Sequence, residues 1–203
     1  MESSDWIVTE AGCCEVLDEI ERGEKLPTPY RLYRLLADLD DILETQTDDR
    51  QRLRRICPIV KQFLTDSPWL EAQYLPPDPQ KGWSVVMLYD EPDYPLTVQM
   101  VAWQPGQVSR IHNHAAWGIV ALLQGREKNT LWQRSPDPEH PDRIERVCEQ
   151  ILEPGETIGF LPEAIHCIEA MGDEPTVSFN LYGKTNYSGR FEFDPIAHRA
   201  TKF

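Results

Sequence analysis

The first seventy residues carry the spacing of amphipathic helices. Apolar residues recur three and four positions apart over residues 7–20, 31–43 and 50–63, which predicts three helices. Pro27 and Pro29 separate the first two, and the Thr-Asp-Asp run at 47–49 offers polar caps for the third. Because the connections are short, we expect these helices to pack on the rest of the chain.

From Trp83 onward the pattern changes to a period of two. Stretches rich in Val, Thr and aromatic residues predict strands over residues 83–89, 96–103, 117–125, 129–134, 156–161 and 176–183. Turn clusters separate them at a spacing of roughly ten residues, which favours an all-β barrel or sandwich over βαβ units. We therefore expect a mainly β fold in one structural domain, with a helical N-terminal segment (1–75) packed on a β-barrel (76–203).

Composition narrows the class of protein. The chain has 203 residues, enough for one domain with its own core, and its net charge of −14 disfavours nucleic acid as a partner. It has no apolar run of about eighteen residues and its first residues are acidic, so we expect a cytoplasmic protein with no membrane partner. Its 5 cysteines lack CxxC spacing, which is typical of free thiols rather than of a disulfide framework or structural zinc site.

Candidate metal ligands stand in a regular glycine frame. His112 and His114 are two apart in a strand-like segment, so both side chains can point to one face, and Gly106, Gly118 and Gly125 flank them. This segment resembles the first motif of the cupin family, except that Gly118 stands where a cupin usually carries a ligand glutamate. Pro162 and His166 resemble the second motif. The resemblance implies a single, jelly-roll-like cupin β-barrel with three histidines lining its interior.

An all-histidine site has chemical consequences. Three neutral imidazoles without a carboxylate leave a divalent metal with its full charge and open positions, which favours an anionic substrate. Imidazole suits Zn, Cu, Fe and Ni, so ligand type alone leaves the metal open. We expect His140, in a turn rich in Pro and Asp, and His198 to lie on the surface rather than to be ligands.

Residues 83–195 also resemble the cupin-type thiol dioxygenases, the family of cysteine dioxygenase and 3-mercaptopropionate dioxygenase. Residues 111–125 and 162–170 are similar to the family segments that carry three histidines, and SFNLY (178–182) is similar to its Ser-x-His-x-Tyr stretch. The resemblance implies Fe(II) on His112, His114 and His166, and addition of both atoms of O₂ to a small thiol to give a sulfinic acid. It also implies catalytic roles for Ser178 and Tyr182, although Asn180 replaces the middle histidine.

Two departures from the family concern the substrate. Animal cysteine dioxygenases cross-link a cysteine at the place of Gly118 to the tyrosine matched by Tyr182, and here that bond cannot form. Their early-strand arginine is absent from residues 83–89, whereas the 3-mercaptopropionate enzymes carry an arginine shortly before Phe-Asp-Pro. Arg190, just before Phe-Asp-Pro at 193–195, is thus the expected partner of a substrate carboxylate, which a guanidinium can grip through two hydrogen bonds. Cysteine and 3-mercaptopropionate both stay open.

Other functions remain as alternatives. A metal cupin of another reaction class is one, although such proteins usually keep the glutamate that Gly118 replaces; a non-catalytic, small-molecule-binding cupin is another. Tyr182 could be an interior aromatic with a satisfied hydroxyl, and Arg190 a surface or salt-bridged arginine. The expected binding partners are a small thiol and O₂, and we expect the chain to be a monomer or a weak homo-oligomer.

Overall fold

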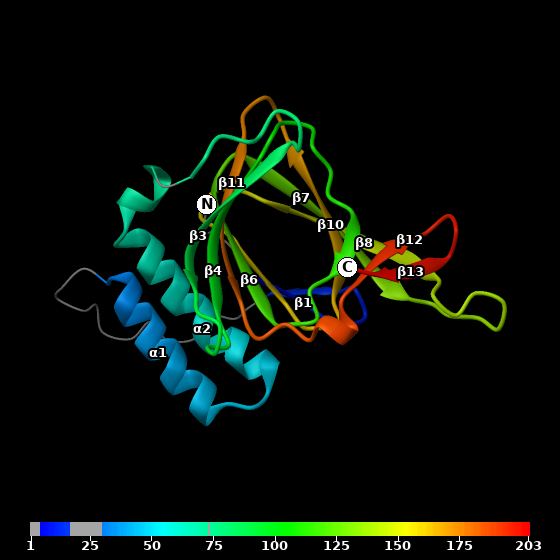
Figure 1. Ribbon diagram of the computed structural model, residues 1–203, viewed down its shortest axis with the longest axis horizontal. Coiled ribbons are helices and arrows are strands. Elements are labelled where there is room, and N and C mark those ends of the chain that lie inside the picture. Colours follow the sequence, from blue (N-terminus) through cyan, green and yellow to red (C-terminus); the bar gives the residue numbers. More distant parts are fainter. Residues whose placement is uncertain (1–4, 17–29, 73) are drawn as a thin grey trace.

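A computed structural model describes residues 5–16, 30–72 and 74–203 (Figure 1). Within these ranges the helices are α1 (Leu32–Thr45), α2 (Asp49–Thr65) and the short 3-10 helices η1 (Pro68–Ala72) and η2 (Tyr187–Gly189). The strands are β1 (Asp5–Val8), β2 (Cys14–Val16), β3 (Trp83–Asp90), β4 (Thr97–Trp103), β5 (Ile111–Asn113), β6 (Gly118–Gln124), β7 (Arg126–Arg134), β8 (Ile144–Leu152), β9 (Thr157–Phe160), β10 (Ile165–Met171), β11 (Thr176–Tyr182), β12 (Phe191–Asp194) and β13 (Arg199–Lys202). The mainly β fold with N-terminal helices is confirmed.

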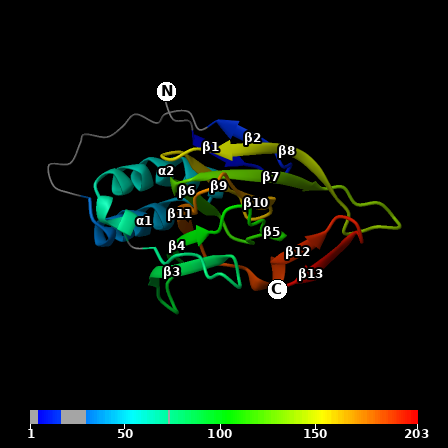
Figure 2. The same cartoon turned by 90° about the horizontal axis from the view of Figure 1, so that it is seen from above.

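The described strands form two sheets. Sheet A has the order β2-β1-β9-β6-β11-β4-β3, and sheet B has the order β13-β12-β5-β10-β7-β8. Side chains from both sheets share one apolar cluster, which includes Val120 of β6, Leu131 of β7 and Phe160 of β9, so the sheets face each other. Figure 2 shows both helices on one side of this assembly. That the two sheets close into a single cupin barrel stays a prediction.

The helices cover the outer face of sheet A. Asp48 caps α2 by accepting a 2.8 Å hydrogen bond from the Gln51 amide, as the polar run at 47–49 predicts. The buried stripe of α2 includes Leu53, Ile56 and Phe63, and it packs with residues of β6 and β11 in the largest apolar cluster. The outer face of sheet A is therefore apolar and is covered by the helices.

The opposite face of sheet A looks toward sheet B and is partly polar. In β11 the odd-numbered residues from 177 to 181 belong to the helix-facing cluster, while Ser178, Asn180 and Tyr182 alternate with them. Sheet B contributes Glu127, Asn129 and His166, which are also buried. The site lies on this shared interior.

The helix expected over residues 7–20 is wrong for its described part. β1 and β2 occupy residues 5–8 and 14–16, and β1 pairs in parallel with β9, so tertiary strand pairing overrides the local three-and-four spacing. Residues 17–20 lie outside the described ranges. The helices expected over 31–43 and 50–63 are confirmed, as are the six expected strands. Of the helices in the described ranges, none has the length and apolar run needed to cross a membrane.

Candidate metal centre

Three histidines from sheet B bring their rings together. His112 lies in β5, His114 directly follows that strand, and His166 pairs with His112 across β5 and β10. One ligand nitrogen from each lies within 4.8 Å of the other two. In the part of the chain that the structure describes, no other group of three His, Cys, Asp or Glu side chains could share an ion. The three predicted ligands are thus brought to one point.

Hydrogen bonds fix which nitrogens face that point. His112 Nδ1 lies 2.9 Å from the Arg110 carbonyl oxygen, and His166 Nδ1 lies 2.9 Å from Asn129 Oδ1. Because both oxygens can only accept, each Nδ1 donates its proton and each Nε2 keeps a lone pair. Burial lowers the pKa of His112, and lowers the pKa values of His114 and His166 well below the ordinary range. The imidazoles are therefore neutral at pH 7, the state that binds metal.

The geometry fits a transition-metal ion. The Nε2 atoms of His114 and His166 are 3.0 Å apart. Two nitrogens at this separation are close enough to bind one ion at about 2.1 Å from each. An all-imidazole set suits Zn, Cu, Fe or Ni. The cluster can hold a metal ion, and its geometry leaves the identity of that ion open.

His114 is positioned by a turn rather than by a strand. The next residue, Ala115, has a φ of 52°, in the left-handed region that is uncommon for a residue with a Cβ. Its amide donates to the Pro162 carbonyl at 3.1 Å, and its carbonyl accepts from the Asn186 amide at 2.9 Å. The loops before β10 and before η2 thus hold the turn that aims His114 at the other two histidines.

A row of hydrogen bonds connects the three interior residues of β11. The Tyr182 hydroxyl donates to Asn180 Oδ1 at 3.0 Å, and Asn180 Nδ2 donates to Ser178 Oγ at 2.9 Å. The amide therefore continues the row at the position where the thiol dioxygenases have histidine. The Tyr182 ring lies 4.6 Å from that of His114, and burial raises the pKa of its phenol, with a further contribution from Glu127.

Gly118 makes room for this tyrosine. It pairs with Tyr182 across β6 and β11, and a Cβ added at Gly118 would lie 2.6 Å from Tyr182 Cδ1. A glycine is needed here because the ring occupies the space of any side chain. The register also places Gly118 directly beside the tyrosine, as the resemblance implies.

Arg190 lies at the edge of the histidine cluster. It follows η2, and Asn113 holds both flanking peptides: Asn113 Nδ2 donates to the Gly189 carbonyl at 2.9 Å, and the Phe191 amide donates to Asn113 Oδ1 at 2.8 Å. The guanidinium carbon lies 4.1 Å from the centre of the Phe203 ring. Arg190 Nε is buried and has no hydrogen-bond partner among the described residues. Asn113, between two predicted ligands in sequence, thus ties Arg190 to them.

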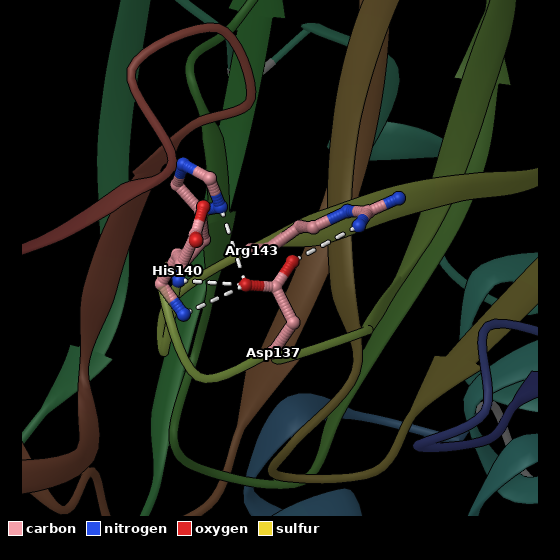
Figure 3. A network of polar contacts seen from close by, with 4 residues as sticks. Asp137, His140 and Arg143 are labelled. Carbon is pink, nitrogen blue, oxygen red and sulfur yellow. Dashed lines mark hydrogen bonds and ion pairs between the residues drawn. The ribbon is translucent and has the colours of Figure 1, made fainter.

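His140 is not part of this cluster. Asp137 accepts from the His140 amide at 2.9 Å, from His140 Nδ1 at 3.2 Å and from Arg143 Nη1 at 3.1 Å (Figure 3). Burial opposes ionisation, but these bonds lower the pKa of Asp137 to about 2. The His140 ring lies 4.5 Å from that of His198. Both histidines are half-buried rather than fully exposed, and they pack the β7–β8 loop on the β12–β13 hairpin.

Sequence reasoning missed four residues around the site: Asn113, Glu127, Asn129 and Phe203. The stretch REKNTLWQR has the pattern of a charged strand. Its apolar residues Leu131 and Trp132 are adjacent and so point to opposite faces, and the sequence therefore does not show which face of the strand is buried. Only the pairing of β7 with β10 brings Asn129 beside His166. Cys167 follows His166 in β10 and so faces away from the site, and Trp117 is a core residue.

No protein-family model matches the chain. Among solved structures, a cupin superfamily protein from Desulfitobacterium hafniense is 12% identical, with a TM-score of 0.39 over 50% of this chain and 77% of that chain. A DMSP lyase is 20% identical, with a TM-score of 0.39 over 52% of this chain and 49% of that chain, so this chain spans about half of its length. The protein TT1209 from Thermus thermophilus is 14% identical, with a TM-score of 0.44 over 57% and 94% of the two chains. Because these scores are low, the fold is assigned from the chain's own strand order and contacts.

Proposed function

We propose that this protein is a cupin-type, non-haem Fe(II) thiol dioxygenase acting on a small thiol carboxylic acid, 3-mercaptopropionate or cysteine. The reaction is R–SH + O₂ → R–SO₂H. The sulfur loses four electrons, both oxygen atoms enter the product, and the thiol proton ends on the sulfinic acid. No further oxidant or reductant is required.

One observation carries the proposal: an all-imidazole cluster lies beside an arginine whose buried Nε has no partner among the described residues. Three neutral ligands leave the charge of a divalent ion uncompensated, and Arg190 adds a further positive charge that helps to lower the pKa of His114. Such a site favours a ligand with two negative groups. A thiolate with a nearby carboxylate is one small ligand of that description.

The side chains would divide the work. His112, His114 and His166 would hold an iron ion, which would supply the redox chemistry between the thiol and O₂. Arg190 binds the carboxylate and so orients the sulfur, and orientation of this kind is a large share of many rate enhancements. Tyr182 supplies a hydroxyl that is protonated near pH 7. In this structure the hydroxyl donates to Asn180 Oδ1, and it would turn its proton from Asn180 to donate a hydrogen bond to substrate.

Oxygen consumption by iron-loaded protein tests the proposal. The panel is 3-mercaptopropionate, cysteine, cysteamine, which has no carboxylate, and mercaptosuccinate, which has two. We expect a carboxylate thiol to be turned over fastest, with one O₂ consumed per thiol and a product heavier by two oxygen atoms. Retained metal without turnover of any thiol would favour a metal cupin of another reaction class, and failure to retain any metal would favour a binding module.

A further inference from the structure

A second polar row, on sheet B, ends at one of the histidines. Glu127 and Asn129 are two apart in β7 and face the interior, where Glu127 is 2% and Asn129 0% exposed. Asn129 Nδ2 donates to Glu127 Oε1 at 2.9 Å, and Asn129 Oδ1 accepts from His166 Nδ1 at 2.9 Å. Neither Glu127 nor Asn129 belongs to the histidine cluster.

The direction of these bonds is determined by the carboxyl group. A side-chain amide can offer His166 either its oxygen or its NH₂ group. The ionised carboxylate of Glu127 can only accept, so it draws the NH₂ group of Asn129 to itself and leaves Oδ1 for His166, as the structure has it. His166 must then carry its proton on Nδ1, which leaves the Nε2 lone pair at the point where the three rings meet.

The other strand-borne histidine does not depend on side chains in this way. His112 Nδ1 donates to the backbone carbonyl of Arg110, an oxygen that cannot be exchanged for a donor by rotation. His166 is therefore held in its binding tautomer by two side chains alone. Burial of Glu127 is unfavourable for its charged form and raises its pKa to about 7, yet both its ionised and its protonated forms retain a carbonyl-type acceptor for Asn129.

We propose that Glu127 is a positioning residue that acts through Asn129 to hold His166 as the Nδ1–H tautomer with Nε2 free for metal. This inference rests on the metal-binding part of the proposed function. Groups next to metal-binding histidines commonly orient the ring, and their loss typically costs 10–100-fold in metal affinity. Glu127 contacts neither substrate nor metal in this role.

The first test needs no metal. Long-range ¹H–¹⁵N NMR spectra of metal-free protein report the tautomer of each histidine ring. We expect the Nδ1–H form of His166 in wild type and in Glu127→Gln, which keeps a carbonyl acceptor, and a mixture of both tautomers in Glu127→Leu, which has none. Glu169→Leu is the matched control: it removes an acid from the outer face of β10, where the side chain is 39% exposed and pairs with Lys128. It should resemble wild type.

The second test is competitive titration with Zn²⁺ and Co²⁺ against a chelator. We expect Glu127→Leu to bind each metal about 10–100-fold more weakly than wild type, and Glu127→Gln and Glu169→Leu to bind within about threefold. An unchanged His166 tautomer and unchanged affinity in Glu127→Leu would overturn the inference while leaving the proposed function standing. If wild type bound no metal, the proposed function would fall, and the tautomer measurement would still decide the role of Glu127.

Discussion

The two faces of β11 are both largely buried but chemically opposite. Toward the helices, Phe179 is 0% exposed, and its ring centre lies 5.6 Å from that of Phe63. Toward the interior, Ser178 and Asn180 are 1% and 5% exposed, and their side chains hydrogen-bond to each other in the row that ends at Tyr182. Burial alone therefore does not separate the core from the site. What separates them is that buried polar groups need partners, and the interior supplies these in short rows.

The difference between the two faces predicts that a substitution in the interior can abolish metal binding while the chain still folds. His166→Ala should abolish retention of metal at micromolar concentrations, a larger effect than the 10–100-fold cost of losing an outer partner. Metal analysis of desalted protein measures this, and circular dichroism should show wild-type secondary structure. Iron content equal to wild type would remove His166 from the site.

Substitutions on the helix-facing side of β11 should instead lower the stability of the fold. Phe179→Ala removes a fully buried ring and should lower the free energy of unfolding by about 3–5 kcal/mol. The neighbouring Ser178→Ala, on the interior side, should cost only about 1 kcal/mol. Urea unfolding of the metal-free proteins compares them directly. Equal losses would mean that the two faces do not differ as described.

Glu127 makes the interior side sensitive to pH. Burial raises its pKa from 4.5 to about 7 in the folded chain, so between these values the folded state keeps a proton that the unfolded state has released. The free energy of unfolding contributed by this group therefore falls as pH rises from 4.5 to 7, by on the order of 3 kcal/mol. Glu127→Gln should be more stable than wild type by about that amount at pH 8 and no more stable at pH 4, in urea unfolding of metal-free protein. A difference independent of pH would contradict this.

Within the interior, Arg190 and Tyr182 should affect different kinetic constants. Arg190→Ala should lose a charge-assisted contact of about 1.5–3 kcal/mol, seen mainly as a higher KM for carboxylate thiols. The kcat/KM for these thiols should fall toward the value for cysteamine. Arg190→Lys should restore part of the loss, because a point charge lacks the planar fork. Tyr182→Phe should instead lower kcat with a smaller change in KM. An Arg190→Ala enzyme with wild-type kcat/KM for 3-mercaptopropionate would transfer the carboxylate role elsewhere.

The sequence predicted best what depends on local spacing. The period of α2 and its cap at Asp48, the glycine frame of His112 and His114, and the alternation of β11 are all properties of short segments, and the structure contains each of them. β8 was missed because its apolar residues do not alternate with polar ones: Val147 is next to Cys148, and Ile151 is next to Leu152.

What escaped prediction depends on pairing between distant segments. Asn129 reaches His166 only through the register of β7 and β10, and Asn113 reaches Arg190 only because η2 returns to β5. The wrong helix over residues 7–16 has the same cause, since β1 gains its strand conformation from β9. A single chain pattern contains no information about these registers, which side-chain packing across the two sheets decides.

The parallel pairing of β1 with β9 has a consequence for folding during translation. Thr157 Oγ1 donates to Asp5 Oδ1 at 2.7 Å, a bond between residues 152 positions apart. At about 5–20 residues per second, translation needs roughly 8–30 s to span that interval. During that interval Ile7 and Val8, which are buried in the finished fold, lack the strand with which they pair. β1 is thus synthesised well before the strand with which it pairs, and its place in sheet A is filled only after β9 has been made.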